Sequence, residues 1–569
     1  MDIFHSGHIA RSVRGMFDAE PLDAVVIGAG FAGLYMVYRL REEGFSVHGF
    51  ERGDGVGGTW YWNRYPGARC DSEIMYYSFS FLPDLEQEWP LTERYPGQPQ
   101  ILSYLEEVAD RLALRADFTF GAEVTAIDYD QAAHRWTLRT RQGHTATARY
   151  VITAVGCLST ANQPRFPGAD AFGGLTLHTG NWPREPVDFA GKRAAVIGTG
   201  SSGIQAIPVI AEQAAHLTVF QRTAQFTIPA ANGPLDEEFV TLWKANYPEW
   251  RRRARHSMAG FPYTASVTSA LEVSEAERTA TYQAQWGAGG FTFLSGSFRD
   301  IGLSEEANKT AADFVRAKID EIVRDQETAA MLKPWEFPIG TKRLPLDTGY
   351  YETFNRPNVT LVDLKRTPVE EITATGIRTS AGHHDLDIIV YATGYDALTG
   401  PLEALGIRGR DGRALKDEWR EGPRTYLGLA VPGFPNLFTI TGPGSPSVLS
   451  NMPVSIEQHV EWIGDCLGWL RDRGDEDGAI EATEESAAAW TEHVQQVAAH
   501  TLHPKAASWY MGANIPGKPR IFLPYIGGVG NYRDRCDAVA ANGYEGFTVS
   551  GTREGSGDDG TRPGDDRAA

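Results

Sequence analysis

Residues 24–33 read AVVIGAGFAG, and residues 194–203 read AAVIGTGSSG. Each segment is a short β-branched run, followed by the pattern G-x-G-x-x-G and by a stretch that is compatible with a helix. A parallel strand, a tight glycine turn and a helix produce this order. The first glycine allows the turn, the second lets a pyrophosphate approach the backbone, and the third lets the helix pack on the strand. The repeat therefore predicts two dinucleotide-binding units.

The residue that ends the second strand of each unit indicates which cofactor the unit prefers. FSVHGFE ends at Glu51, and a carboxylate there accepts hydrogen bonds from ribose hydroxyls and repels a 2′-phosphate, which suits FAD or NAD. LTVFQR ends at Arg222, followed by Thr223, and this pair suits the 2′-phosphate of NADP. Two sites with opposite charge preference imply a flavin dehydrogenase architecture.

Composition narrows the class of protein. The chain has 569 residues, of which 42% are hydrophobic and 22% charged, which is ordinary for a globular protein. A net charge of −20 disfavours nucleic acid and anionic lipid as partners. The four cysteines form no CxxC pair, so no metal site is expected. No signal peptide or membrane-spanning run is visible, and we expect a cytoplasmic protein without membrane insertion or an obligate protein partner.

The predicted fold class is α/β, with two Rossmann-like domains and a helical insertion in the NADP domain. Residues 229–334 lack strand alternation, and 274–286 and 311–325 look like amphipathic helices. The basic run Arg251–Arg253 with Arg255 is expected to form a solvated helix face. The buried strand within 387–396 is expected to return the chain to the FAD domain. The predicted boundaries are 1–155 and 386–550 for the FAD domain, 156–228 and 335–385 for the NADP domain, 229–334 for the insertion and 551–569 for a disordered tail.

A further motif lies between the two glycine turns. AFGGLTLHTGNWP (171–183) matches the fingerprint F-x-G-x-x-x-H-x-x-x-W-P, with Phe172, Gly174, His178, Trp182 and Pro183 in register. With GGTWYWNRYPGARCD (57–71), TKRLPLDTGYYETFNRPNV (341–359), TGPGSPSVLSNM (441–452) and SWYMGANIPGKPR (508–520), the chain resembles the type I Baeyer–Villiger monooxygenases. It looks most like the phenylacetone and steroid monooxygenase branch.

The resemblance implies a reaction and two cofactors. NADPH would reduce FAD, O2 would convert the reduced flavin to a C4a-peroxide, and the peroxide would attack a hydrophobic ketone to give an ester or lactone. Sulfoxidation is expected as a side activity. A heteroatom oxygenase and a non-catalytic redox sensor are the alternatives. The intact pair of Arg343 and Asp71 argues against the first, and the retained Arg343 and second glycine motif argue against the second.

The resemblance also assigns roles at the reaction centre. Arg343 matches the catalytic arginine, a fixed cation that stabilises anionic oxygens, and Asp71 matches the carboxylate that orients it. Lys342 matches the residue that reaches the 2′-phosphate with Arg222 and Thr223. The alternatives are a structural salt bridge for Arg343, a turn residue for Asp71 and a solvated lysine for Lys342.

The predicted site residues fall into three groups. The flavin site comprises Gly28, Gly30, Phe31, Ala32, Gly33, Glu51, Arg52, Gly58, Thr59, Trp60, Asp71, Tyr77 and Val124. The NADP site comprises Gly198, Thr199, Gly200, Ser201, Ser202, Gly203, Gln205, Arg222, Thr223, Lys342, Arg343 and Trp509. The substrate pocket comprises Ser447, Val448, Leu449 and Met452. Trp60 and Tyr77 could also be plain core residues.

The fingerprint residues are expected at the linker between the nucleotide domains. His178 either couples NADP binding to domain rotation or is a hydrogen-bonded core histidine. Phe172 and Trp182 are expected to pack in the same linker. Cys70, beside Asp71, is expected to be inert because no adjacent base accompanies it.

Overall fold

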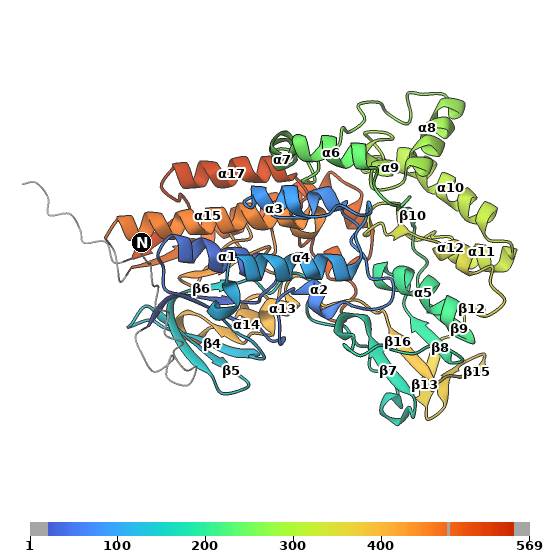
Figure 1. Ribbon diagram of the computed structural model, residues 1–569, viewed down its shortest axis with the longest axis horizontal. Helices are drawn as coiled ribbons and strands as arrows, with labels where there is room; N and C mark the ends of the chain where they lie inside the picture. Colours follow the sequence, from blue (N-terminus) through green and yellow to red (C-terminus); the bar gives the residue numbers. More distant parts are fainter. Residues whose placement is uncertain (1–20, 475–477, 551–569) are drawn as a thin grey trace, which may run out of the picture.

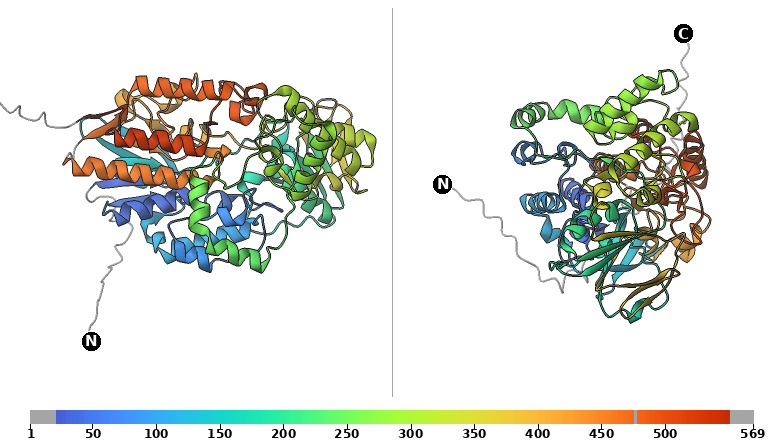
Figure 2. Two further views of the ribbon diagram at one scale, coloured as in Figure 1. Left: turned by 90° about the horizontal axis from the view of Figure 1, so that it is seen from above. Right: turned by 90° about the vertical axis from the view of Figure 1, so that its right-hand side faces the viewer.

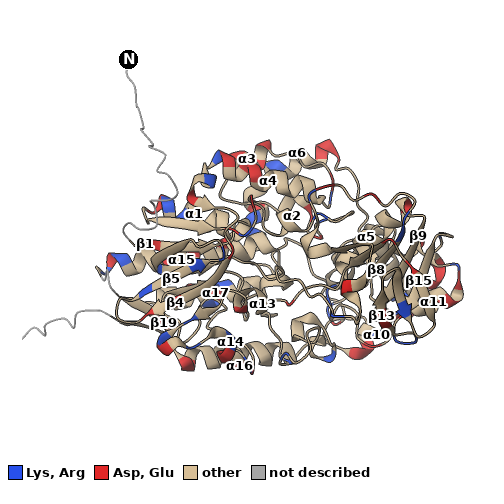
Figure 3. Ribbon diagram, turned by 90° about the horizontal axis from the view of Figure 1, so that it is seen from below, with Lys and Arg blue, Asp and Glu red and all other residues tan. Residues whose placement is uncertain are grey.

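A computed structural model describes residues 21–474 and 478–550 (Figure 1). The predicted α/β class with two Rossmann-like units is confirmed. The expected disordered tail, 551–569, lies outside the described residues. None of the helices within those two ranges combines the length and the apolar character that crossing a bilayer requires. Figure 3 shows basic and acidic residues interspersed over both halves of the molecule.

The first sheet has eight strands and carries the first glycine turn. Its order is β17-β4-β5-β6-β1-β2-β3, and β18 pairs with β6. The strands are β1 (Leu22–Ile27), β2 (Val47–Phe50), β3 (Phe118–Thr119), β4 (Val124–Asp130), β5 (Arg135–Thr140), β6 (Thr145–Thr153), β17 (Ile407–Arg408) and β18 (Leu437–Thr439). β1 is parallel to β2 and β6, so its carboxyl end opens between them at the edge where a dinucleotide binds.

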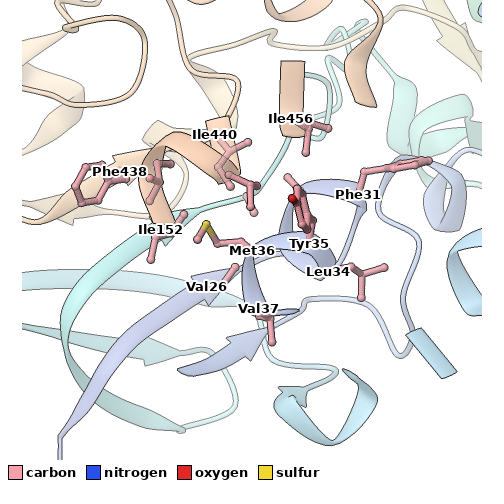
Figure 4. Close-up of a cluster of buried hydrophobic side chains, with 14 of the residues drawn as sticks. Val26, Phe31, Leu34, Tyr35, Met36, Val37, Ile152, Phe438, Ile440 and Ile456 are labelled. Carbon is pink, nitrogen blue, oxygen red and sulfur yellow. The ribbon is translucent and has the colours of Figure 1, made fainter. Parts of the chain in front are cut away.

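Helix α1 (Phe31–Glu42) follows β1 directly and packs against α15 (Met452–Asp472). Gly28 has φ 109°, and a Cβ at Gly33 would lie 1.8 Å from the Gly28 carbonyl oxygen, so only glycine fits this crossing of strand and helix. Figure 4 shows part of the buried cluster that joins the sheet to these helices, including Val26, Leu34, Tyr35, Met36, Ile152, Phe438 and Ile456.

The second sheet has five parallel strands in the order β12-β9-β8-β16-β7. They are β7 (Leu175–His178), β8 (Arg193–Ile197), β9 (His216–Gln221), β12 (Val359–Asp363) and β16 (Ile388–Tyr391), and α5 (Ser201–Gln213) follows β8. An antiparallel sheet of β13 (Val369–Thr373), β14 (Gly376–Thr379) and β15 (Gly382–Asp385) lies between β12 and β16 in the chain.

The structure corrects one predicted boundary. The sequence expects the chain to re-enter the FAD domain at residue 386, but β16 pairs with β8 and β7 of the second sheet. The continuous apolar run 388–391 is buried because it lies in the middle of this parallel sheet. The chain therefore leaves the second sheet only after Tyr391.

Residues 229–334 contain six helices: α6 (Glu237–Ala245), α7 (Tyr247–Arg255), α8 (Glu275–Ala288), α9 (Thr292–Ser295), α10 (Glu305–Ile322) and α11 (Gln326–Leu332). The two predicted amphipathic stretches fall in α8 and α10. Side chains of Ser274 and Ser304 accept backbone N–H groups at the starts of these helices. The paired strands β10 (Ile228–Pro229) and β11 (Leu346–Asp347) connect the insertion to the rest of the chain.

The insertion packs in two parts. Helices α6 and α7 pack with residues 74–91, which follow the first glycine unit, whereas α10 and α11 pack with the second sheet. Figures 1 and 2 show the insertion bridging the two halves. The predicted solvated face of α7 is wrong for Arg251, which is buried against Glu86 and Ser78. Arg255 keeps 38% of its side chain exposed while donating to the Ser80 hydroxyl.

The remaining helices and strands, apart from α12, lie around the first sheet. They are α2 (Thr59–Trp62), α3 (Pro83–Glu88), α4 (Gln98–Arg111), α12 (Tyr350–Thr353), α13 (Gly400–Glu403), α14 (Leu415–Glu418), α16 (Glu484–Ala499), α17 (Val529–Ala541), β19 (Ala479–Ala482) and β20 (Phe547–Ser550). α12 lies against α5 of the second sheet instead.

Candidate functional site

A cavity of about 930 Å³ lies between the two sheets, and both glycine turns open into it. Most of the predicted site residues line it: Gly28, Gly30, Phe31, Ala32, Glu51, Arg52, Gly58, Thr59, Trp60, Asp71, Tyr77, Val124, Gly198, Thr199, Gly200, Ser201, Ser202, Gln205, Arg222, Thr223, Lys342, Arg343, Val448, Met452 and Trp509. Those outside the lining are Gly33, Gly203, Ser447, Leu449 and the fingerprint residues Phe172, Gly174, His178, Trp182 and Pro183. Gly33 and Gly203 face their own strands instead, where a Cβ would meet backbone oxygen.

The carboxylate of Glu51 is fixed at the first glycine turn. Its Oε2 accepts the backbone N–H of Ala29 at 2.8 Å, and its Oε1 accepts that of Gly53 at 2.7 Å. Burial raises the pKa of Glu51, and these two N–H groups counter part of that rise. Each oxygen keeps a second lone pair for a ribose hydroxyl. The residues at this turn therefore fit the adenosine half of FAD.

Aromatic side chains form the wall beside this turn. Trp60 Nε1 donates to the Tyr77 hydroxyl at 3.3 Å, and their rings meet edge to face at 5.9 Å. Phe31 lies 5.2 Å from the Tyr77 ring. Trp60 belongs to the hydrophobic core, Tyr77 packs against it, and both also line the cavity. That they contact the flavin stays a prediction. Such a wall suits a flat heteroaromatic ring.

Two cations lie side by side at the second glycine turn. Burial, and then the charge of Arg222, lower the pKa of Lys342 to about 8. Within the described ranges neither cation forms an ion pair, and the Lys342 ammonium lies 4.2 Å from the Phe337 ring centroid. Thr223 is held by its carbonyl, which accepts the Thr199 hydroxyl at 3.1 Å. Two neighbouring cations without an acidic partner among the described residues, beside a helix N-terminus, fit a phosphate dianion. The dianion would relieve the repulsion between Arg222 and Lys342.

Arg343 and Asp71 meet at the wall of the cavity, although 272 residues separate them. Arg343 Nε and Nη2 both donate to Asp71 Oδ2, at 2.8 and 2.6 Å. Nη1 donates to the Val448 carbonyl at 2.9 Å. The side chains of Arg343 and Asp71 keep 26% and 27% of their surfaces open, and both line the cavity. This salt bridge therefore presents its cation to any molecule bound there.

The protonation of Arg343 is secure. Burial lowers its pKa, but the negative charge of Asp71 and the hydrogen bonds to that carboxylate more than offset this effect, so the net shift of the pKa is upward; Tyr510 is a further close neighbour of the guanidinium. The Phe291 ring adds a cation–π contact, with its centroid 5.0 Å from the guanidinium carbon. The site thus holds a permanent, oriented positive charge.

Three neighbours of Arg343 were not predicted from the sequence. Phe291 lies in the insertion, which carries no motif. Gln225, three residues after Arg222, donates from Nε2 to the Arg343 carbonyl at 2.9 Å. Tyr510 adjoins the predicted Trp509, and that adjacency was the one available signal. Phe291 and Gln225 have no residue pattern of their own, because each is defined by a contact between distant segments, whereas Tyr510 lies within the motif at 508–520.

His178 sits outside the cavity lining. It is 8% exposed, its Nδ1 accepts the Gly180 N–H at 2.9 Å, and its Nε2 lies 3.4 Å from the Thr393 hydroxyl. Burial lowers the pKa of His178, which favours the neutral ring. These contacts fit the hydrogen-bonded core histidine. A coupling role stays a prediction.

The loop 447–452 enters the cavity beside Arg343. Ser447 has φ 40°, an uncommon left-handed conformation for a residue other than glycine. Its hydroxyl lies 2.8 Å from the Cys157 sulfur. Val448 and Met452 line the cavity, whereas Ser447 and Leu449 are not among its lining residues. Cys70 is a buried thiol whose pKa burial raises, which agrees with an inert role.

Known proteins share this architecture. Residues 25–232 match the model of the pyridine nucleotide-disulphide oxidoreductase family. A phenazine N-monooxygenase from Lysobacter antibioticus is 44% identical over 535 residues, which cover 94% of this chain and 98% of that protein. A Baeyer–Villiger monooxygenase from Pseudooceanicola batsensis is also 44% identical over 535 residues, 94% of this chain and 97% of that protein. The solved structure of a steroid monooxygenase bound to NADP matches with a TM-score of 0.89 and 51% identity, over 94% of this chain and 100% of that one.

Proposed function

Because the chain belongs to the family of flavin-dependent Baeyer–Villiger monooxygenases, we propose that its central cavity inserts one oxygen atom of O2 beside the carbonyl of a hydrophobic ketone. The enzyme uses FAD and NADPH. One observation carries the proposal. Arg343, oriented by Asp71, holds a permanent positive charge in the cavity into which both glycine turns open.

Different residues of the chain have different roles in this reaction. Glu51 and the aromatic wall of Trp60 and Tyr77 would hold FAD, which would supply the redox chemistry that activates O2 with electrons from NADPH. Arg343 stabilises the anionic oxygens that develop as the ketone carbon is attacked, and Asp71 keeps the guanidinium in place. Arg222 and Lys342 bind the 2′-phosphate, and Glu51 binds the ribose in the adenosine half of FAD. The loop 447–452, here called the substrate loop, and its apolar Val448 and Met452 receive the ketone.

Oxidation of a nitrogen atom is the second candidate. It is supported by the phenazine N-monooxygenase, whose identity to this chain equals that of the Baeyer–Villiger relative. Attack by a nucleophilic amine or sulfide on an electrophilic oxygen needs no stabilised oxyanion, so this reaction would leave the Arg343–Asp71 pair without a role. Ketone oxidation is therefore the better match, with sulfoxidation as a side activity.

The test is product identification with purified enzyme, NADPH and 18O2. Cyclohexanone, phenylacetone, phenazine and an aryl alkyl sulfide are supplied separately, and products are analysed by mass spectrometry. We expect an ester or lactone that carries one 18O atom from at least one ketone. Conversion of phenazine alone, or NADPH consumption that yields only hydrogen peroxide with every ketone, would contradict the proposal.

The variant Arg222→Ala should lose its preference for NADPH. A charge-assisted contact with the 2′-phosphate contributes about 1.5–3 kcal/mol, so KM for NADPH should rise roughly 10- to 100-fold. KM for NADH should change little, because NADH lacks this phosphate. Steady-state kinetics with both cofactors measure the effect. An equal loss for the two cofactors would make Arg222 structural.

Binding of NADPH should weaken as pH rises past about 8. The pKa of Lys342 is lowered to about 8 in the cofactor-free protein, so its positive charge is present below that pH and is lost above it. The Kd for NADP+ should therefore rise between pH 7 and 9 in fluorescence titrations, whereas the Kd for NAD+ should not. Lys342→Met should bind NADP+ weakly at both pH values and show a flatter profile. A profile unchanged in this variant would assign the titration to another group.

A further inference from the structure

We propose that the helical insertion sets the shape of the substrate loop through Asn451 and the 257–260 segment, and so selects which ketones are accepted. This inference rests on the proposed function of the cavity. Neither Asn451 nor the 257–260 segment lines the cavity. Their influence would be exerted by positioning the residues that do.

Asn451 is a fully buried member of the substrate loop, between Val448 and Met452. Its backbone N–H donates to the Ala259 carbonyl at 2.8 Å. Its Nδ2 donates to the Gly260 carbonyl at 3.3 Å and to the Tyr76 carbonyl at 3.0 Å. One side chain thus joins the loop to the insertion and to the segment that follows the first glycine unit.

The contact between the two backbones is close. Gly260 has φ +73°, and a Cβ there would lie 3.0 Å from the Asn451 Cβ and 3.3 Å from its nitrogen. A Cβ at Gly260 would be closer than ordinary van der Waals contact, so Asn451 at the start of α15 would have to shift by a few tenths of an ångström. The absence of a Cβ at Gly260 therefore fixes how near the loop lies to the insertion.

The 257–260 segment is itself firmly held. The carbonyls of Ser257 and Met258 accept the N–H groups of Gly530 and Val529 at 3.0 and 2.9 Å, at the start of α17. Figure 1 shows α7 beside this end of α17. Arg251 fixes α7 before the segment, with Nε 2.7 Å from Glu86. After the segment, the Tyr263 hydroxyl donates to Glu73 at 2.6 Å.

The other end of the substrate loop is held at the reaction centre. The Val448 carbonyl accepts Arg343 Nη1 at 2.9 Å, and the Ser450 hydroxyl donates to the Ser447 carbonyl at 2.7 Å. The loop is thus fixed between Arg343 and Asn451. A displacement at Asn451 must be absorbed by the few residues between them, which include the cavity-lining Val448. Asn451 and Gly260 are positioning residues in this scheme.

The experiment compares Gly260→Ala with Gly191→Ala. Gly191 has φ +71° and no atom within 4 Å of its Cβ position, so this control reproduces the backbone strain without the contact. For each variant, FAD content, the rate of flavin reduction by NADPH, and kcat/KM for cyclohexanone and phenylacetone are measured. Asn451→Ala, which removes the Nδ2 donor, is measured in the same way.

In Gly260→Ala and Asn451→Ala we expect the ratio of the two kcat/KM values to shift about fivefold or more, within the range that a reshaped apolar pocket can produce. Flavin reduction should stay within about twofold of wild type, since neither Asn451 nor Gly260 lines the cavity into which the glycine turns open. Gly191→Ala should leave the ratio unchanged. An unchanged ratio in Gly260→Ala, an equal shift in Gly191→Ala, or loss of FAD from Gly260→Ala alone would overturn the proposal. Failure of the proposed function itself would appear first, as a wild-type enzyme that makes no ester.

Discussion

Replacement of Arg343 by alanine should stop ester formation while NADPH still reduces the flavin. Hydride transfer depends on how the two cofactors are placed, whereas attack on the ketone develops negative charge on oxygen beside the guanidinium. Loss of one preorganised stabiliser of this kind costs about 3–4 kcal/mol, roughly 10²- to 10³-fold in rate. Anaerobic stopped-flow absorbance measures reduction, and mass spectrometry measures ester.

Two comparisons make this result specific. Arg343→Lys keeps the charge but cannot reproduce the donors of Nε and Nη2 to Asp71 and of Nη1 to Val448, so it should recover little ester formation. Asp71→Asn keeps the shape and weakens the orientation of the guanidinium, and should give an intermediate loss. Ester formation by Arg343→Ala within tenfold of wild type would remove this residue from the reaction.

Replacement of Arg251 by alanine should destabilise the protein strongly. Arg251 is buried with Glu86 and also donates to the Ser78 hydroxyl at 2.7 Å. Burial raises the pKa of Glu86, and Arg251 only partly counters that rise. Removing the cation leaves an uncompensated carboxylate between α3 and α7, which costs about 3–5 kcal/mol. The apparent melting temperature, followed by flavin fluorescence, should fall clearly.

Arg252→Ala is the matched control, because Arg252 lies on the same helix with 66% of its side chain exposed. Among the residues that the structure describes, its one ion pair is with Glu249. An exposed pair of this spacing contributes about 0.2–0.5 kcal/mol, so melting should barely change. The loss of stability in Arg251→Ala should become smaller as pH falls, since protonation of Glu86 removes its unpaired negative charge. The double variant with Glu86→Gln should recover part of the loss. Equal melting temperatures for the two arginine variants would contradict this account.

The sequence determined the parts of this protein that depend on local geometry. A glycine at positive φ, a strand that ends in a turn and a helix that starts there are set by residues within about a dozen positions of each other. Both glycine turns, the α/β class and the helices of the insertion could therefore be predicted. Arg343 and Asp71 were identified through the family resemblance, since residue pattern alone does not distinguish a reactive arginine from a surface one.

Only the tertiary structure decided the strand pairing, burial and hydrogen bonding that depend on contacts between distant segments of the chain. β16 reads as a buried strand in either sheet, and only its pairing with β7 and β8 places it in the second. Arg251 lies in a basic run like many solvated ones, and its burial depends on Glu86, 165 residues away. Asn451 and Gly260, 191 residues apart, carry no pattern that links them. Burial and hydrogen bonding are properties of neighbours in space, and a sequence orders residues only along the chain.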